Sequence, residues 1–274
     1  MTLTQYPDAL SVRVACRRGA HKSHTAGLAP RHLQANLLII PKAYATDFRR
    51  LCQRNPVACP LLAESPAPGN VGFAKHIAKD IDIRFDAPAY NIYENGKLVK
   101  ADVPSIEDYW TEDSVAFLIG CSFSFEGALS DAGLVPRHVE LDRNVPMYRT
   151  TLALMPSGVF EGNIVVSMRP CLPEDIPYVR EITSAFDKTH GCPIAWGHDA
   201  PARLGIADIN RPDFGDPPVL RPGEVPVFWG CGVTPQLSVM SSPALTGVAI
   251  SHSPGKMVLL DYTVDSLRNG GQGL

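Results

Sequence analysis

VAFLIGCSFSFE, residues 115–126, is the stretch that decides the predicted fold. Its apolar beginning is typical of a buried strand, because both faces of an inner strand must avoid water. Gly120, Cys121 and Ser122 follow, and such small residues allow a sharp turn and the close approach of a ligand. The residues from Ser124 onward predict a helix, with Ser122 or Ser124 as its N-cap. Ligands bind at the carboxyl ends of strands in open α/β sheets, so we expect a site here.

The same design returns in VPVFWGCGVTPQ, residues 225–236. An apolar run again ends in a small-residue turn, Gly230-Cys231-Gly232, and Pro235 suits the first turn of a following helix. Two such units predict two strand ends that face one cleft. Cys121 and Cys231 are then either a functional pair or buried, inert thiols, because a reactive cysteine needs thiolate character and exposure.

Composition limits the classes of protein to consider. The 274 residues are enough for one large domain or two modest ones. A net charge of −3 gives no electrostatic footprint for nucleic acid or a membrane surface, and no apolar run approaches the ~18 residues of a membrane span. Charged residues interrupt the first twenty positions, unlike a signal peptide. Seven cysteines without a CxxC pair argue against a disulfide framework, so we expect a cytoplasmic protein.

Hydrophobic periodicity and turn residues predict the remaining elements. Apolar residues at helical spacing predict helices over residues 6–18, 43–55 and 173–186, while short apolar or alternating runs predict strands over 36–40 and 80–85. Turn residues predict two hairpins, 90–93 with 97–99 around Asn95-Gly96, and 148–155 with 159–168 around 156–158. Residues 249–261 are expected to close the fold as strand, turn and strand with His252 at the turn, and the tail 268–274 is expected to fray.

These elements predict an α/β protein of two parts. Residues 139–192 read as a ββα unit that interrupts the pattern around them. We therefore expect a main α/β domain with a large mixed sheet, made of residues 1–138 and 193–274, and a smaller α+β domain, 139–192, inserted into it.

Two arginines in the second hairpin are candidates for substrate binding. If the turn centres near Val159, Arg149 and Arg169 lie opposite each other on the same face. Paired guanidinium groups there suit a carboxylate substrate, which arginine binds bidentately. The alternative is two solvated arginines at strand ends.

The sequence predicts no cofactor. His190 with Cys192, and His198 with Asp199, could be read as metal ligands, but no further pair has a recognisable ligand spacing. GxGxxG is absent, and Pro254-Gly-Lys256 lacks the spacing of a phosphate-binding loop. We expect no organic cofactor and no metal, with a divalent cation left as an unsupported alternative.

Seven motifs, in order along the chain, carry a resemblance to a known family. They are GCSFSFE (120–126), NVPMYRT (144–150), VVSMRP (165–170), HG.P (190–193), GD.P (215–218), FWGCGVTPQ (228–236) and SHSPGKM (251–257). Together they resemble a family of bacterial hydro-lyases to which the vertebrate D-glutamate cyclase domain is similar, and the likeness extends from Thr25 almost to the end. Cys192 departs from it, where a small residue is expected, as does the longer segment 66–79. The resemblance implies an α/β domain joined to a smaller α+β domain.

The resemblance also implies an activity, the loss of water as D-glutamate closes to 5-oxo-D-proline. Such a reaction needs a carboxylate anchor, a base for the amine, an acid for the departing hydroxyl and donors for the oxyanion. The implied acid and base are Glu126 and His252, and backbone N–H groups around Cys121-Ser122 and Gly232 are implied donors. The residues expected to contact the substrate are Arg149, Arg169, Ser122, Ser124, Gly232 and Thr234.

Two alternatives remain open at this point. Cys121 and Cys231 would form the acid/base pair of a cofactor-independent amino-acid racemase, which exchanges the α-proton of its substrate. A non-catalytic module that binds small acids would instead show ligand-dependent stabilisation without turnover. In each case the expected partner is a small-molecule carboxylate, not nucleic acid or a membrane, and a homo-oligomer is left open.

Overall fold

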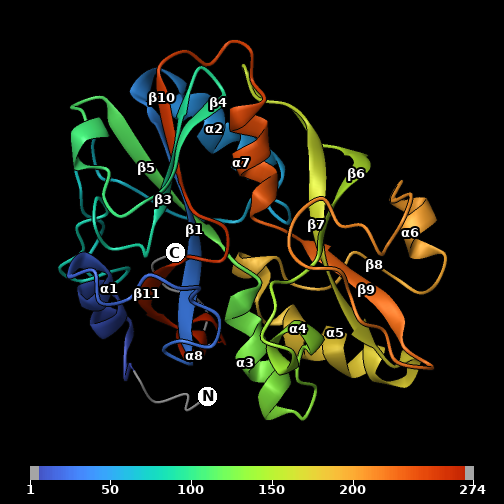
Figure 1. The fold of residues 1–274 in the computed structure, drawn as a ribbon. Coiled ribbons are helices and arrows are strands. Elements are labelled where there is room, and N and C mark those ends of the chain that lie inside the picture. The colour runs from blue at the N-terminus through green and yellow to red at the C-terminus, as the bar shows by residue number, and fades with distance from the viewer. Residues whose placement is uncertain (1–5, 269–274) are drawn as a thin grey trace.

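The computed structural model describes residues 6–268 and contains two β-sheets with helices packed around them (Figure 1). The larger sheet has seven strands, in the spatial order β2 (Leu61–Glu64), β5 (Ser114–Gly120), β1 (His32–Pro41), β10 (Val248–His252), β3 (Tyr90–Glu94) and β4 (Lys97–Val103), with β11 (Val258–Thr263) paired to β1. The smaller sheet has four, in the order β6 (Met147–Ala153), β7 (Asn163–Cys171), β9 (Val225–Gly230) and β8 (Ala195–Trp196). All pairings between these strands of the described chain are antiparallel, so the mixed character predicted for the larger sheet is wrong.

Helices and sheets together confirm the α/β class. The helices are α1 (Ala9–Arg17), α2 (Lys42–Arg54), α3 (Phe123–Asp131), α4 (Arg137–Glu140), α5 (Ile176–Ser184), α6 (Ala200–Arg203), α7 (Val233–Met240) and α8 (Val264–Arg268), with 3₁₀ turns η1 (Glu107–Tyr109), η2 (Pro173–Asp175) and η3 (Asp187–Thr189). The predicted helices at 6–18 and 43–55 are confirmed as α1 and α2, and 173–186 contains η2 and α5. No helix within residues 6–268 combines the length and the apolar character that crossing a membrane requires.

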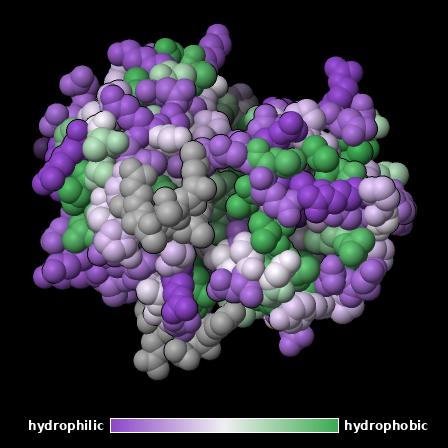
Figure 2. Space-filling view, turned by 60° about the horizontal axis from the view of Figure 1, so that its bottom comes forward, coloured by the Kyte–Doolittle hydropathy of each residue, from purple (hydrophilic) through white to green (hydrophobic). Residues whose placement is uncertain are grey.

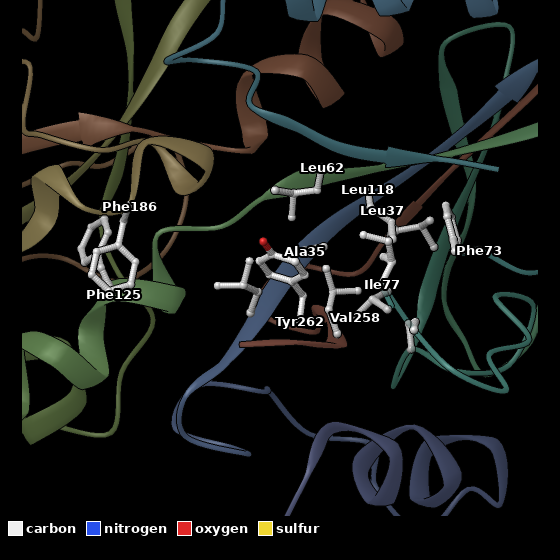
Figure 3. Packing of buried hydrophobic residues seen from close by; sticks show 14 of the residues in the cluster. Ala35, Leu37, Leu62, Phe73, Ile77, Leu118, Phe125, Phe186, Val258 and Tyr262 are labelled. Atoms are coloured by element: carbon white, nitrogen blue, oxygen red, sulfur yellow. The ribbon is translucent and has the colours of Figure 1, made fainter. Parts of the chain in front are cut away.

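One hydrophobic core joins the two sheets. Ala35 and Leu118 of the larger sheet belong to the same buried cluster as Phe125 of α3 and Phe186, which lie at its other end (Figure 3). Trp229 of β9 also belongs to it, with its ring centroid 5.6 Å from that of Phe125. Helix α3, which follows β5 of the larger sheet, is therefore anchored against the smaller sheet. The outer surface in Figure 2 is mainly hydrophilic, with the hydrophobic groups most frequent on the lobe at the right.

The strand predicted at residues 80–85 is wrong. This segment is a series of turns in which Asp80 adopts a positive φ of 54°. The carboxylate of Asp82 accepts a hydrogen bond from the backbone N–H of Arg84 at 3.1 Å, which favours a turn over a strand. The hydroxyl of Tyr90 donates to the carbonyl of Ile83 and thereby fixes the segment to β3.

Both predicted hairpins are present, as β3–β4 and β6–β7. The first turns at Asn95 and Gly96, whose φ angles are 49° and 77° as its tight turn requires. The second belongs to a sheet that β8 and β9 complete, and both of these strands lie beyond the predicted boundary at residue 192. The smaller sheet therefore extends past the predicted insert 139–192, while the division into domains stays a prediction. The predicted tail, 268–274, lies outside the described residues except for Arg268.

The topology contains an internal repeat. The chain passes through β1, α2, β2, β5, α3 and β6, and then through β7, α5, β8, β9, α7 and β10, with β3 and β4 as an addition to the first passage. The corresponding strands have the same spatial order in the two sheets, β2-β5-β1-β10 and β8-β9-β7-β6. The last strand of each repeat pairs within the sheet of the other. The connections α3–β6 and α7–β10 therefore cross between the sheets, and α7 lies between β1 and β7 in Figure 1.

Strand register supports this repeat at the level of single residues. Gly120 lies opposite Ala35, and Gly230 lies opposite Val166. Four residues after each glycine, a hydroxyl is fixed to the neighbouring strand. Ser124 Oγ accepts from the N–H of Gln34 at 3.1 Å, and Thr234 Oγ1 accepts from the N–H of Val165 at 2.9 Å.

Candidate active site

The two Gly-Cys turns lie together in the folded chain, as the sequence predicts. Both cysteines belong to one small buried cluster, which we call the motif cluster. Its members are Cys121, Phe123, Val145, Met147, Val165, Cys231 and Met257. They come from five separate segments, each of them within a motif that carries the family resemblance. The centre between the two repeats is therefore the candidate active site.

Close backbone packing explains the glycine that precedes each cysteine. A Cβ atom on Gly120 would lie 2.0 Å from the carbonyl oxygen of Lys188, and one on Gly230 would lie 3.1 Å from Nδ1 of His190. His190 is buried, has a positive φ of 84° and contacts the carbonyl of Val57 through Nδ1 at 2.8 Å. The two glycines thus allow the His190 turn to lie against both strand ends.

A buried ion pair links the two repeats beside this centre. Glu126, in the first turn of α3, accepts hydrogen bonds at Oε1 from both Nε and Nη2 of Arg169 in β7, the former at 3.0 Å. Burial alone would raise the pKa of Glu126, but the neighbouring His138 and Arg169 lower it to about 2. Glu126 is therefore a fixed carboxylate at neutral pH, a state that does not suit a general acid.

Sequence reasoning missed His138, the third member of this network. Its Nε2 lies 3.0 Å from Oε1 of Glu126, although not in the direction of a hydrogen bond, and its ring stacks on Phe123 with 6.2 Å between centroids. His138 lies in the four-residue helix α4, whose short length leaves no periodic pattern to mark it.

Arg169 also orients Ser122. Its Nη2 donates to Ser122 Oγ at 3.0 Å, and its Nη1 donates to Ser167 Oγ at 3.1 Å. Because Ser122 Oγ accepts this bond, its own proton is left to donate, and no residue of the described chain accepts it. Ser122 is thus a buried hydroxyl donor at the start of α3, polarised by a cation.

Asn36 and His252 form a second polar group, in which Asn36 lies against both Gly-Cys turns. The side-chain amide of Asn36 donates to the carbonyl of Gly120 at 3.0 Å, and its Oδ1 lies 3.1 Å from Nε2 of His252. Burial lowers the pKa of His252 to about 4, and the contact of Nδ1 with the carbonyl of Ser253 at 2.7 Å opposes this shift. His252 is the last residue of β10 rather than a turn residue. The position of this amide at the start of the predicted apolar strand 36–40 was the available signal for Asn36.

The predicted pairing of Arg149 with Arg169 is wrong. Arg149 lies opposite Val165, and Arg169 lies opposite Val227 of β9. The Arg149 side chain is 61% exposed and lies 3.8 Å from Asp213, whereas that of Arg169 is 2% exposed. The two guanidinium groups therefore do not form one carboxylate fork, and Arg169 uses its own donors on Glu126 and the serines.

The other predicted substrate contacts have structural partners. The hydroxyls of Ser124 and Thr234 bind backbone atoms of β1 and β7, respectively. Gly232 provides space, because a Cβ atom there would lie 2.0 Å from Nδ2 of Asn36. Of the predicted substrate contacts, Ser122 therefore retains a free donor, while Gly232 makes room for the Asn36 amide.

Replacing Gly232 by alanine should displace Asn36 and lower the free energy of unfolding by about 1–3 kcal/mol, the usual cost of overpacking a buried site. Gly127 is the matched control, because a Cβ atom there meets nothing within 4 Å and the residue lies within α3. Gly127→Ala should stabilise the protein by about 0.5–1 kcal/mol, since alanine favours a helix. Urea denaturation of both variants measures the difference, and equal effects would contradict the proposed packing.

Both thiols of the motif cluster are in a state that disfavours reaction. Burial raises the pKa of Cys231 to about 11 and raises that of Cys121 further above its usual range. Their exposed fractions are 8% and 5%. A thiol needs thiolate character and access to act as a base or nucleophile.

The two thiols should therefore resist a water-soluble aromatic disulfide reagent. In a variant that lacks the more exposed Cys171 and Cys192, the native protein at pH 7.5 should react about 10²-fold more slowly than free cysteine. The same variant in denaturant, where every thiol is accessible, supplies the control. Fast labelling of Cys121 or Cys231 in the native state would contradict burial and favour the two-thiol mechanism.

Two buried histidines should make stability depend on pH. Burial lowers the pKa of both His190 and His252 to about 4, below the value of 6.5 for a free histidine. Their stabilisation is therefore complete above about pH 6.5 and is lost as pH falls towards 4, by about 2 kcal/mol for each residue at pH 5. His190→Asn keeps a residue that tolerates a positive φ. Between pH 7.5 and pH 5, its free energy of unfolding, measured by urea denaturation, should fall by about 2 kcal/mol less than that of the wild type. Equal losses would contradict this account.

No metal site can be assigned from side-chain positions. Within residues 6–268, no three His, Cys, Asp or Glu side chains come together as a group that could hold a metal ion. Neither of the pairs considered as metal ligands, His190 with Cys192 and His198 with Asp199, therefore has a third ligand within these residues. Independence from metals and cofactors stays a prediction.

Comparison with known proteins first defines the class. The chain is 50% identical to a protein of Burkholderia cenocepacia over 255 residues, which cover 93% of this chain and 96% of the relative. It is 49% identical to a protein of Ruegeria pomeroyi, covering 93% and 90%, and 46% identical to one of Methylobacterium radiotolerans, covering 93% and 92%. Each of the three relatives bears the name "Putative hydro-lyase".

The family itself follows from a second comparison. The model of the family described as D-glutamate cyclase matches residues 115–261, which include both Gly-Cys turns and His252. The chain belongs to the D-glutamate cyclase family. Neither comparison supports a two-cysteine racemase or a non-catalytic binding module.

Proposed function

We propose that the protein is a carbon–oxygen lyase that removes water from a small amino acid, and that D-glutamate, closing to 5-oxo-D-proline, is its substrate. One observation carries the proposal. The carbonyl of Gly120 accepts from Asn36, the neighbour of His252, while the hydroxyl of Ser122 accepts from Arg169. Only Cys121 separates these two positions. A polarised donor and the hydrogen-bond partner of a proton-transfer group thus lie at neighbouring positions of one turn.

The reaction defines what these groups must do. The α-nitrogen forms a bond to the γ-carbon, and the bond from that carbon to one oxygen breaks. Two protons leave the ammonium nitrogen and both reach the departing oxygen, so that the products are a lactam and water. Proton transfer and stabilisation of the tetrahedral oxyanion are therefore the catalytic tasks, and neither requires a thiolate.

We assign proton transfer to His252. A pKa near 4 leaves the ring neutral at pH 7, so it accepts each of the two protons from nitrogen in turn and passes it to the leaving oxygen. Glu126 takes no proton in this scheme, because Arg169 holds it as the carboxylate. It instead keeps Arg169 in place.

We assign recognition of the developing oxyanion to Ser122. Its free hydroxyl proton and the backbone N–H groups at the starts of α3 and α7 provide donors near the cluster. The positive charge of Arg169 strengthens the Ser122 donor. A small carboxylate is thus the proposed partner, while the oligomeric state and a cytoplasmic location stay predictions.

Chiral chromatography of reaction mixtures tests the proposal. Purified protein incubated with D-glutamate should form 5-oxo-D-proline, and L-glutamate should give less product. Ser122→Ala should reduce kcat by about 10²-fold, the usual effect of one lost oxyanion donor. The matched variant Ser130→Ala, in the last turns of the same helix, should retain activity because its hydroxyl bonds only the carbonyl of Glu126. Absence of product from either enantiomer would reject glutamate as the substrate.

A further inference from the structure

The orientation of the Asn36 amide is fixed by two backbone carbonyls. Its Nδ2 lies 3.0 Å from the carbonyl oxygen of Gly120 and 3.4 Å from that of Ile119. A rotated amide would place Oδ1 against both oxygens, which are acceptors only. The observed orientation therefore directs Oδ1, and not the amide nitrogen, at His252.

His252 consequently faces an acceptor at each ring nitrogen. Nδ1 lies 2.7 Å from the carbonyl oxygen of Ser253, and Nε2 lies 3.1 Å from Oδ1 of Asn36. A neutral imidazole donates from one nitrogen only, so one lone pair must lie against an oxygen. The shorter contact places the proton on Nδ1 and the unmatched lone pair on Nε2. Protonation of Nε2 converts this opposed contact into a hydrogen bond.

We propose that Asn36 is a positioning residue that fixes the neutral tautomer of His252 with its proton on Nδ1 and stabilises the imidazolium formed when Nε2 takes a proton. The source of that proton rests on the proposed cyclisation, but the effect of Asn36 on His252 does not. Burial favours the neutral imidazole, whereas the Asn36 oxygen favours the imidazolium. The ring is therefore neutral at rest, but the cost of protonating it is reduced.

Among the groups around His252, the Asn36 side chain is the one whose replacement should change the pKa of the ring most. Tyr90 is the titratable residue of β3 that lies opposite His252, and its hydroxyl points to Ile83 and Ala87. Across Asn36 lie the turns that carry Cys121 and Cys231, whose thiols stay protonated at neutral pH. Within the described residues, His252 makes no ion pair with a charged side chain.

The internal repeat shows that this amide is particular to one half of the site. Gly120 lies opposite Ala35, and Asn36 is the next residue. In the other repeat Gly230 lies opposite Val166, and the next residue is Ser167. Ser167 accepts from Arg169 instead. One half of the centre thus holds a cation and the other a proton carrier.

Histidine-labelled protein, studied by long-range ¹H–¹⁵N NMR without substrate, tests the inference. His252→Gln identifies the signals. In the wild type above pH 7, the proton should be on Nδ1 and absent from Nε2. Asn36→Ser should lower the pKa of His252 by about one pH unit, because it removes the side-chain oxygen that stabilises the imidazolium. Asn91→Ser is the control, since that buried amide contacts the side chain of Ser253 but not the ring, and it should leave the pKa unchanged.

Two results would overturn the inference. One is a neutral wild-type ring with its proton on Nε2, a result that needs no variant to fold. The other is a pKa of His252 in Asn36→Ser equal to that in the Asn91→Ser control. Neither depends on turnover, so failure of the proposed reaction with D-glutamate is a separate outcome.

Discussion

Arg169→Met should lower the free energy of unfolding by about 3–5 kcal/mol, because it leaves the carboxylate of Glu126 buried without its cation. Arg169 is also packed between Phe125 and Trp229, at 5.0 and 5.3 Å from their ring centroids. Methionine retains much of that apolar contact, so the loss reports mainly on the ion pair. Urea denaturation at pH 7.5 measures it.

Arg149→Met is the matched control for this variant. Arg149 lies in the neighbouring strand of the same sheet but is mostly exposed, so its replacement should change stability by no more than about 0.5 kcal/mol. The double variant Arg169→Met/Glu126→Gln should regain part of the loss, because it removes the unpaired charge. Equal effects of Arg169→Met and Arg149→Met would contradict a structural role for the buried pair.

His252→Gln should reduce the rate of cyclisation by about 10²- to 10⁴-fold, the range expected when a general acid–base group is removed. Glutamine is similar in size but cannot carry a proton between nitrogen and oxygen. His24→Gln is the control, because His24 is exposed and its contact with Asp142 is long, at 3.7 Å. Kinetics and thermal denaturation of both variants should be compared at pH 7.5.

A folded His252→Gln protein within about threefold of wild-type activity would remove His252 from the mechanism. Loss of activity together with loss of the folded state would instead indicate a structural role. Retention of the thermal transition is therefore part of the expected result.

Local patterns in the sequence were sufficient for the elements that position the site. Each strand, Gly-Cys turn and helix start is contiguous, so apolar runs and small residues predicted both units and their convergence. Asn95-Gly96 predicted its hairpin for the same reason, since a positive φ at both positions is a local requirement.

Non-local pairing could not be read in the same way. The arginine pair was placed by assuming a turn centred near Val159, but Arg149 pairs with Val165, and β6 and β7 are separated by the loop between Ala153 and Asn163. The alternating pattern of the two strands allows either register. The same limitation concealed the exchange of β6 and β10 between sheets.

The missed polar residues show a related limitation. Asn36 and His138 acquire significance only from their partners, His252 and Glu126, which are 216 and 12 residues away in sequence. Glu126 was predicted, with His252, as a candidate for the acid or the base. Its low pKa comes from Arg169 and His138, and neither contact follows from sequence spacing.

Proton NMR of the protein with D-glutamate in D₂O tests the central claim most directly. The account predicts that signals of 5-oxoproline grow while the signal of the α-proton is retained, since no bond to the α-carbon breaks. Loss of the α-proton signal without cyclisation would contradict the account and favour proton abstraction by the two thiols. An unchanged spectrum would contradict D-glutamate as the substrate.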